Sequence, residues 1–192
     1  VVVPGFHDSH MHLLHWGLGM MGVDLTAARS VDEMIRLGQE FARSTPDQEW
    51  IIGRGWNDEN FAIKALPAKE DLDQISPYRP VIFTRVCGHV CVVNSRALEL
   101  AGINASTPNP PGGSIDRKSC GEPTGILREN AIVLVRRLLP EPTLTDMKEV
   151  ISKAAHAAAA LGLTTVQTND LDGAGSLSMQ LDAYRELAAD DK

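Results

Sequence analysis

The first twelve residues join an apolar run to a dense group of polar side chains. Residues 1–3 are all valine, Pro4 and Gly5 follow, and residues 6–12 read Phe-His-Asp-Ser-His-Met-His. A β-branched run bounded by proline and glycine is typical of a buried strand in a parallel sheet. The segment therefore predicts a buried parallel strand over residues 1–3 that leads into the densest set of potential metal ligands in the chain.

The spacing of the histidines after this strand predicts a metal site. In an extended chain, side chains alternate between two faces, so His10 and His12 project to the same side. Asp8 shares their parity, whereas His7 points the other way. Two imidazoles one residue apart can bind a single cation. The alternative is a loop of surface histidines, but the preceding apolar run favours His10 and His12 as metal ligands.

Helix and strand patterns farther along the chain indicate an α/β fold. Ser30 and Glu33 have the spacing of a capping box, which predicts a helix that ends near Ser44. Thr145 is predicted to cap the longest helix, and β-branched residues 163–168 follow that helix as a strand. A helix, a strand and a further helix in this order favour a parallel sheet. The chain has too few such units to close an eight-stranded barrel, which takes about 250 residues.

Charge and cysteine usage limit the partners and the compartment. The net charge is −7 and no basic stripe is visible, which argues against a nucleic-acid partner. No apolar run approaches the ~20 residues that a membrane span needs. Three cysteines, an odd number, suggest reduced thiols and hence a cytoplasmic protein. The chain begins without Met on a strand-like run, so we expect the natural N-terminus to lie upstream.

The cysteines also allow a second, weaker interpretation. Cys87 and Cys91 flank His89, and the three could be described as a zinc site. Structural zinc sites usually have four ligands and tighter pairing, so small buried thiols packed as apolar side chains are favoured instead.

The segment from Val3 to His12 resembles the opening strand of the amidohydrolase superfamily. In that superfamily, a Pro-Gly-hydrophobic-x-Asp-x-His-x-His motif ends the first strand of a metal-binding (β/α)8 barrel. Most members have an aliphatic residue where this chain has His7. Within the superfamily the chain resembles the amidohydrolase 3 type, which includes N-substituted formamide deformylase and the YtcJ-like hydrolases. The matching stretches include Gly53-Arg54-Gly55-Trp56, Gly88-His89, Asn94-Ser95, Gly112-Gly113, Gly121-Glu122-Pro123-Thr124-Gly125 and Gly162-Leu163-Thr164-Thr165-Val166.

The resemblance implies a fold and a division of the chain. The fold is α/β: the first two strands of a metal-dependent (β/α)8 TIM-like barrel, with an α+β insert between them. Residues 1–46 would form the first barrel strand and its helix, residues 47–128 the insert, and residues 129–192 barrel helices and the second barrel strand. An upstream β-rich domain and the remaining barrel would lie outside the chain. The remaining ligands, a lysine, two histidines and an aspartate, are expected beyond Lys192.

The resemblance also implies a reaction. One or two divalent ions, with Zn²⁺ the expected metal, would bind His10 and His12 and activate a water that hydrolyses a C–N bond of an amide or formamide. The general base is expected beyond Lys192, so the 192 residues alone should have negligible hydrolase activity. The alternative is a non-catalytic interaction module or an inactive fragment. We expect a small-molecule substrate and no nucleic-acid or membrane partner. A homo-oligomer remains open, because part of a barrel would expose apolar edges.

The same resemblance predicts substrate-binding residues within the insert. His89, Trp56 and Asn94 are the candidates. Two alternatives stay open: Trp56 as a core residue, and His89 as a side chain satisfied by a backbone carbonyl. For Glu129, an acid at a helix N-terminus is favoured over a bridging carboxylate. His15 is expected to support a site or to lie on the surface rather than to bind metal, and the role of His7 is left open.

Overall fold

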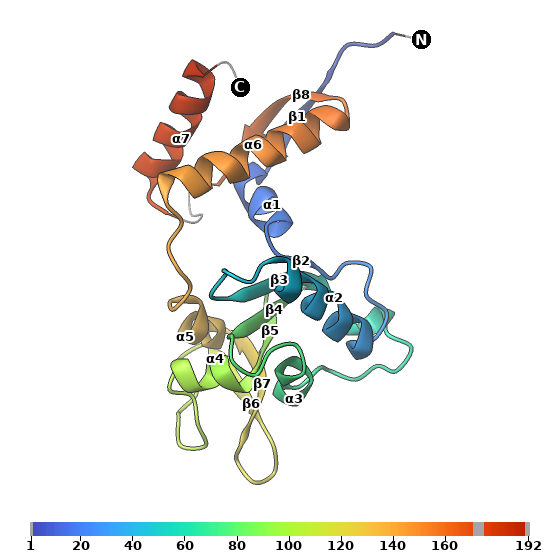
Figure 1. Cartoon of the computed structure of the whole chain (residues 1–192), viewed down its shortest axis with the longest axis vertical. Helices are drawn as coiled ribbons and strands as arrows, with labels where there is room; N and C mark the ends of the chain where they lie inside the picture. The colour runs from blue at the N-terminus through green and yellow to red at the C-terminus, as the bar shows by residue number, and fades with distance from the viewer. Residues whose placement is uncertain (1, 171–174, 191–192) are drawn as a thin grey trace. The chain divides into compact units, whose positions relative to one another are not determined.

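The computed structural model describes residues 2–170 and 175–190. It contains both helices and strands, which confirms the predicted mixed α/β class (Figure 1). The chain divides into two compact units: Val1–Met21 together with Pro140–Lys192, hereafter the first unit, and Gly22–Leu139, the second unit. Val1 lies outside the described residues, so the strand predicted over residues 1–3 is assessed at Val2 and Val3.

A parallel pair of strands forms the centre of the first unit. Its described elements are β1 (Phe6–Met11), α1 (Leu13–Met20), α6 (Leu144–Ala160), β8 (Leu163–Thr168) and α7 (Leu177–Ala189). β1 and β8 run parallel, with Phe6 opposite Leu163 and Met11 opposite Thr168. The pairing confirms the parallel arrangement predicted from the order of helix and strand around residues 163–168.

The buried strand predicted at the N-terminus is wrong for Val2 and Val3. These side chains are 99% and 60% exposed, and the strand begins only at Phe6. β8 begins at Leu163, the partner of Phe6, so the valines have no neighbouring strand within the described part of the chain. A β-branched run favours the extended conformation, but burial depends on a partner that local sequence does not reveal.

The helices of the first unit pack through small residues. Leu14, Met147, Val150, Ile151 and Ala183 form its buried apolar cluster. Gly17 of α1 faces α6, and a Cβ at this position would lie 2.7 Å from the backbone oxygen of Val150. The close approach of α1 to α6 therefore requires glycine at position 17, and it holds the start of α1 beside the β1–β8 pair.

The N-terminus of α6 is capped by Thr143 rather than by the predicted Thr145. The Thr143 hydroxyl accepts a hydrogen bond from the Asp146 backbone N–H at 3.2 Å, and the Asp146 carboxylate accepts one from the Thr143 N–H at 2.8 Å. Both threonines are compatible with an N-cap, but Asp146 is three residues after Thr143 and completes a reciprocal capping box. Thr145 lies in the first helical turn instead.

We expect Thr143→Ala to lower the free energy of unfolding by about 1 kcal/mol, because the substitution removes the hydroxyl that accepts the Asp146 N–H and donates to the Asp146 carboxylate. The exposed Thr145→Ala is the matched control and should change stability by less than about 0.5 kcal/mol. Urea unfolding followed by circular dichroism measures both.

Hydrogen bonds from the Thr143 hydroxyl and backbone N–H lower the pKa of Asp146. The Asp146 carboxylate therefore stabilises the folded protein above its unfolded pKa, and this stabilisation is lost as the pH falls through its lower folded pKa. Thr143→Ala should reduce the loss of stability at low pH.

The second unit is built on a mixed sheet with strand order β2-β3-β4-β5-β7-β6. β2, β3 and β4 are parallel, and the other neighbouring pairs are antiparallel. The strands are β2 (Val23–Asp24), β3 (Ile51–Trp56), β4 (Val81–Arg85), β5 (Val90–Val93), β6 (Gly113–Arg117) and β7 (Pro123–Glu129). The helices are α2 (Val31–Ser44), α3 (Lys69–Asp73), α4 (Ser95–Leu100) and α5 (Val133–Arg136), with 3-10 turns at Asp58–Asn60 and Asn130–Ile132.

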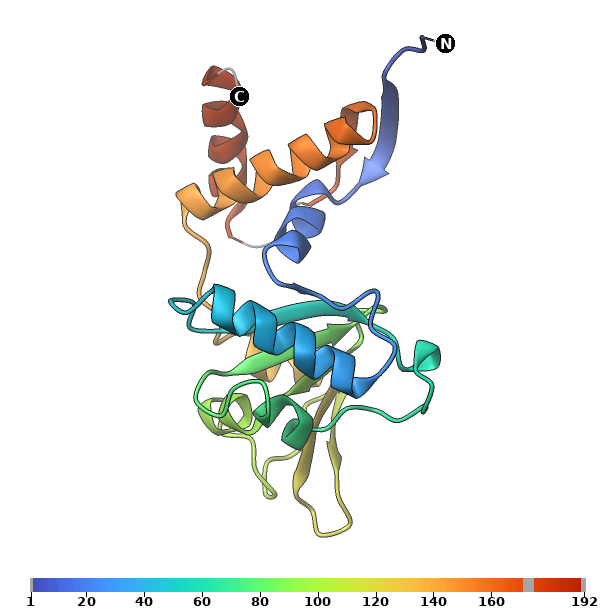
Figure 2. The same ribbon diagram turned by 45° about the vertical axis from the view of Figure 1, so that its right-hand side comes forward.

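Both faces of this sheet are covered. Successive residues of β4 alternate between two apolar clusters: Phe83 belongs to one and Ile82 to the other, as the period of a strand requires. Met34 of α2 packs in the cluster with Phe83, and Figure 2 shows α2 lying across this face of the sheet. Leu98 of α4 packs in the opposite cluster.

The helix predicted from the capping box is confirmed, but it belongs to the second unit. The Ser30 hydroxyl accepts the Glu33 N–H at 3.1 Å, and α2 ends at Ser44 as expected. Its apolar side chains pack on the six-stranded sheet. The observed boundaries, at 21/22 and 139/140, therefore differ from those predicted at 46/47 and 128/129. The apolar pattern of an amphipathic helix indicates that one face is buried, but it does not indicate which sheet that face packs against.

Helix length bears on membrane insertion. Over residues 2–170 and 175–190, no helix has both the length and the apolar character needed to cross a bilayer. The longest helix in this part of the chain, α6, has 17 residues and is partly polar, whereas a span needs about 20 apolar ones.

Candidate metal centre

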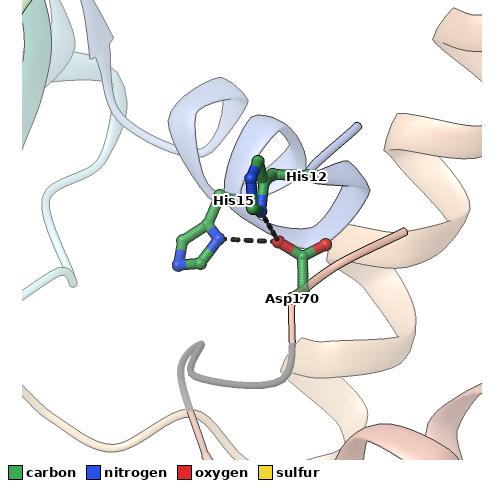
Figure 3. A group of neighbouring side chains, drawn as sticks. All are labelled: His12, His15 and Asp170. Atoms are coloured by element: carbon green, nitrogen blue, oxygen red, sulfur yellow. Dashed lines mark hydrogen bonds and ion pairs between the residues drawn. The ribbon is translucent and has the colours of Figure 1, made fainter. Parts of the chain in front are cut away.

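Three potential metal ligands meet in the first unit, at the carboxyl ends of the paired strands. His12 follows β1 and forms the N-cap of α1, His15 lies in the first turn of α1, and Asp170 comes shortly after β8 (Figure 3). Because β1 and β8 are parallel, the residues that follow them lie at the same edge of the pair. One ligand atom of each residue lies within 4.8 Å of the others.

The Asp170 carboxylate is the centre of this cluster. Its Oδ1 lies 2.6 Å from His15 Nδ1 and 3.3 Å from His12 Nδ1. The Asp170 side chain is 3% exposed, whereas those of His12 and His15 are 50% and 42% exposed. A buried carboxylate thus lies against two imidazoles that are themselves about half exposed.

The second carboxylate oxygen of Asp170 is bonded to its own surroundings. Oδ2 accepts hydrogen bonds from the Leu14 backbone N–H at 2.7 Å and from the Thr168 hydroxyl. Burial by itself would raise the pKa of Asp170, but hydrogen bonds from Thr168, Leu14 and His15 outweigh burial and lower the pKa below its usual value. The side chain is therefore an ionised acceptor, and His15 Nδ1, which is hydrogen-bonded to it, donates.

His10 lies beside this cluster. Its ring centroid is 5.5 Å from that of His12, and the His12–His15 centroid distance is 5.7 Å. Two imidazoles on one tetrahedral zinc ion, with Zn–N bonds of about 2.1 Å, have centroids roughly 5 Å apart. Both histidine pairs therefore have the spacing of ligands that share an ion. Nitrogen and carboxylate donors together suit borderline divalent metals such as zinc.

The alternation that predicted a shared face for His10 and His12 is interrupted in the structure. The β1–β8 register shifts between Asp8 and Met11, and His12 has left the strand. The His10 backbone N–H donates to the Asp8 carboxylate at 2.9 Å, and the His10 side chain is exposed. The two rings remain neighbours, so metal binding by His10 and His12 stays a prediction.

Asp170 was not predicted as part of the site, and His15 was expected to support a site or to lie on the surface rather than to bind metal, although the sequence contains a signal for each. His15 follows His12 by three residues, which places both on one side of a helix that begins at His12. Asp170 follows the predicted strand over residues 163–168, at the end where parallel strands present functional groups.

Two of the predicted substrate-binding residues are committed to the core of the second unit. Trp56 is 0% exposed, and its indole N–H donates to the Phe83 carbonyl at 3.0 Å. Asn94 is also 0% exposed and caps α4, with both its amide oxygen and its amide nitrogen hydrogen-bonded to backbone groups. Neither side chain has a free polar atom for a ligand, which agrees with the core alternative for Trp56.

His89 is the accessible member of the predicted set. Its side chain is 69% exposed, and Nδ1 lies 2.9 Å from the Glu129 carboxylate, which replaces the backbone partner considered from the sequence. Glu129 has a positive φ of 51°, a conformation rarely adopted by non-glycine residues and often found at functional sites. Substrate binding by His89 stays a prediction.

The alternative zinc site at Cys87, His89 and Cys91 is not formed among residues 2–170 and 175–190. Cys91 is fully buried in the sheet, and burial raises the pKa of its thiol to about 12. A thiol that stays protonated packs as a small apolar side chain and is a poor metal ligand.

Comparison with known proteins identifies the family. The model of the amidohydrolase family matches residues 1–192. The chain is 38% identical to a putative amidohydrolase, YtcJ, of Bacillus subtilis (strain 168), over 100% of this chain and 36% of that protein. It is 34% identical to N-substituted formamide deformylase of Arthrobacter pascens, over 70% of this chain and 25% of that protein.

Solved structures agree with these sequence matches. An uncharacterised metal-dependent hydrolase from Pyrococcus horikoshii OT3 superposes with a TM-score of 0.67 at 28% identity, covering 98% of this chain and 34% of that one. A counterpart from Pyrococcus furiosus gives 0.65 at 30% identity. The chain spans about a third of the length of its relative YtcJ and of these hydrolases. The chain belongs to the amidohydrolase family.

Proposed function

We propose that the protein is a metal-dependent hydrolase that acts on C–N bonds of amides or formamides. The observation that carries this proposal is the group of imidazoles around Asp170 at the carboxyl ends of two parallel strands. Membership of the amidohydrolase family and the similarity to N-substituted formamide deformylase support it. In this proposal β1 and β8 are adjacent strands of a (β/α)8 barrel, and the second unit is an insertion between them.

His10 and His12 are the proposed ligands, and Zn²⁺ is the proposed ion. When bound, a zinc ion lowers the pKa of a coordinated water toward ~7 and polarises the scissile carbonyl. The chain holds His12 at the start of α1, with its ring against Asp170 and its side chain 50% exposed. A carboxyl-end position on parallel strands is where barrel enzymes place their reacting groups.

The substrate is proposed to be a small molecule, with His89 as a residue that contacts it. His89 is exposed and paired with Glu129, so its far ring nitrogen is free to meet a polar substrate atom. The alternative function is a non-catalytic interaction module. Chelation separates the two, because removing the ion should abolish turnover in a metal hydrolase and leave a docking surface unaffected.

The test is made with the protein as its gene encodes it, using an N-formyl amine as substrate. We expect zinc to copurify and turnover to be lost on chelation and restored by added zinc. His12→Asn should lose both zinc and turnover, whereas the exposed His156→Asn on α6, the matched control in the same unit, should retain both. Turnover that persists in excess chelator would contradict a metal mechanism. Bound zinc without hydrolysis of any amide would favour the interaction module.

A further inference from the structure

We propose that Asp170 is a positioning residue for the metal centre. Its buried carboxylate binds His12 through Nδ1 and so dedicates His12 Nε2 to the ion. This inference rests on the proposed metal-dependent function and goes beyond it, because it assigns a role to a residue outside the His-x-His motif and specifies which ring nitrogen binds.

The first argument is the orientation of the imidazoles. Both dashed contacts in Figure 3 run from Nδ1 to the same Asp170 oxygen, at 3.3 Å from His12 and 2.6 Å from His15. A neutral imidazole carries one N–H, so a ring that donates from Nδ1 presents its lone pair at Nε2. Metal-binding histidines typically donate their other ring N–H to a carboxylate, which fixes the tautomer and the ring plane.

The second argument is that Asp170 also fixes the backbone beneath the rings. His12 is the N-cap of α1 but makes no side-chain capping bond. The Leu14 N–H, one of the donors left free at a helix start, donates to Asp170 Oδ2 at 2.7 Å instead. An anionic oxygen at this position is favoured by the helix dipole. One carboxylate thus lies against the ring of His12 and holds the turn of helix that carries it.

The third argument concerns the alternative that Asp170 itself binds the ion. The carboxylate is 3% exposed, and both oxygens already accept hydrogen bonds, from Leu14 and Thr168 on Oδ2 and from His15 on Oδ1, which also lies 3.3 Å from His12 Nδ1. The His12 and His15 side chains are 50% and 42% exposed, so the rings are far more accessible than the carboxylate. The buried, fully bonded position favours a supporting carboxylate over a ligand that must face a water and a substrate.

The experiment reads the histidine tautomers by ¹⁵N NMR in the protein as its gene encodes it, first without metal and then with zinc. In the metal-free wild type we expect His12 to be protonated at Nδ1. With zinc bound, Nδ1 should keep its proton and Nε2 should shift as the coordinated atom. Zinc bound through His12 Nδ1 would overturn the proposal, since Asp170 could then not be the partner of that nitrogen.

Asp170→Asn provides the second readout. Losing the charge and one acceptor oxygen should shift His12 toward the Nε2–H tautomer and weaken zinc binding about 10–100-fold. The matched control is Asp182→Asn, at an exposed aspartate on α7. It should change neither the His12 tautomer nor the affinity for zinc. Equal zinc affinity in the wild type and in Asp170→Asn would contradict the positioning role of Asp170 but not the proposed function. A wild type that binds no zinc would instead contradict the proposed function. If Asp170→Asn does not fold, the wild-type tautomers still decide the question.

Discussion

Replacing Asn94 by leucine is expected to lower the free energy of unfolding of the second unit by about 4 kcal/mol or more. Asn94 Oδ1 accepts the Val81 and Ala97 N–H groups at 3.0 and 2.9 Å, and Nδ2 donates to the Ser76 and Arg79 carbonyls, each at 2.9 Å. Leucine has a similar size but leaves all four buried backbone groups without this partner. Each unsatisfied group costs about 1–3 kcal/mol.

Thermal and urea unfolding followed by circular dichroism measure this loss. Asn130→Leu is the matched control: Asn130 is exposed and its side chain donates to the Pro111 carbonyl, so the loss should be at most about 1 kcal/mol. A stable Asn94→Leu protein with weakened substrate binding would contradict the structural role and favour the substrate-binding role predicted from family resemblance. The two roles therefore predict opposite outcomes.

The second large effect is expected at Trp56. Trp56→Ala should lower the free energy of unfolding by about 3–5 kcal/mol, because a fully buried indole leaves a cavity that the sheet cannot close. Trp56→Phe keeps most of the ring volume and should lose less, chiefly the hydrogen bond to the Phe83 carbonyl. The unfolding transition is followed by far-UV circular dichroism, so that it does not depend on tryptophan emission.

An exposed aromatic residue in the same unit supplies the control. Tyr78 is 86% exposed, so Tyr78→Ala should change stability by no more than about 0.5 kcal/mol. A Trp56→Ala protein as stable as wild type would mean that the indole does not support the core. Together with the asparagine variants, this measurement tests whether Trp56 and Asn94, which the family resemblance predicted to bind substrate, instead stabilise the fold.

Local patterns predicted the local structure well. Ser30 and Glu33 indicated the start of α2, and the β-branched residues 163–168 indicated β8. These signals succeed because capping bonds and strand preference act within a few residues. The same reasoning named Thr145 as the cap of α6, whereas the structure has Thr143 at that position, because Asp146 completes a capping box with Thr143.

Contacts between distant residues were the part that sequence patterns could not supply. Val2 and Val3 are exposed because β8 begins too late to cover them. The motif predicted a role for His12, but Asp170 was not predicted: its place after a strand suggests a functional position without identifying the histidines that it meets. The apolar face of α2 likewise does not identify the sheet that it covers.

The hydrogen bond between Leu14 and Asp170 joins residues 156 positions apart. The second unit, by contrast, is continuous in sequence and completes its sheet with its own residues. Closing a flexible loop becomes less favourable as the loop lengthens, by about 0.6 kcal/mol for each doubling. Prior folding of Gly22–Leu139 removes most of the flexible chain from that loop. The histidines and the aspartate are thus expected to meet most readily after the intervening segment has folded, so that the candidate metal centre would form late in folding.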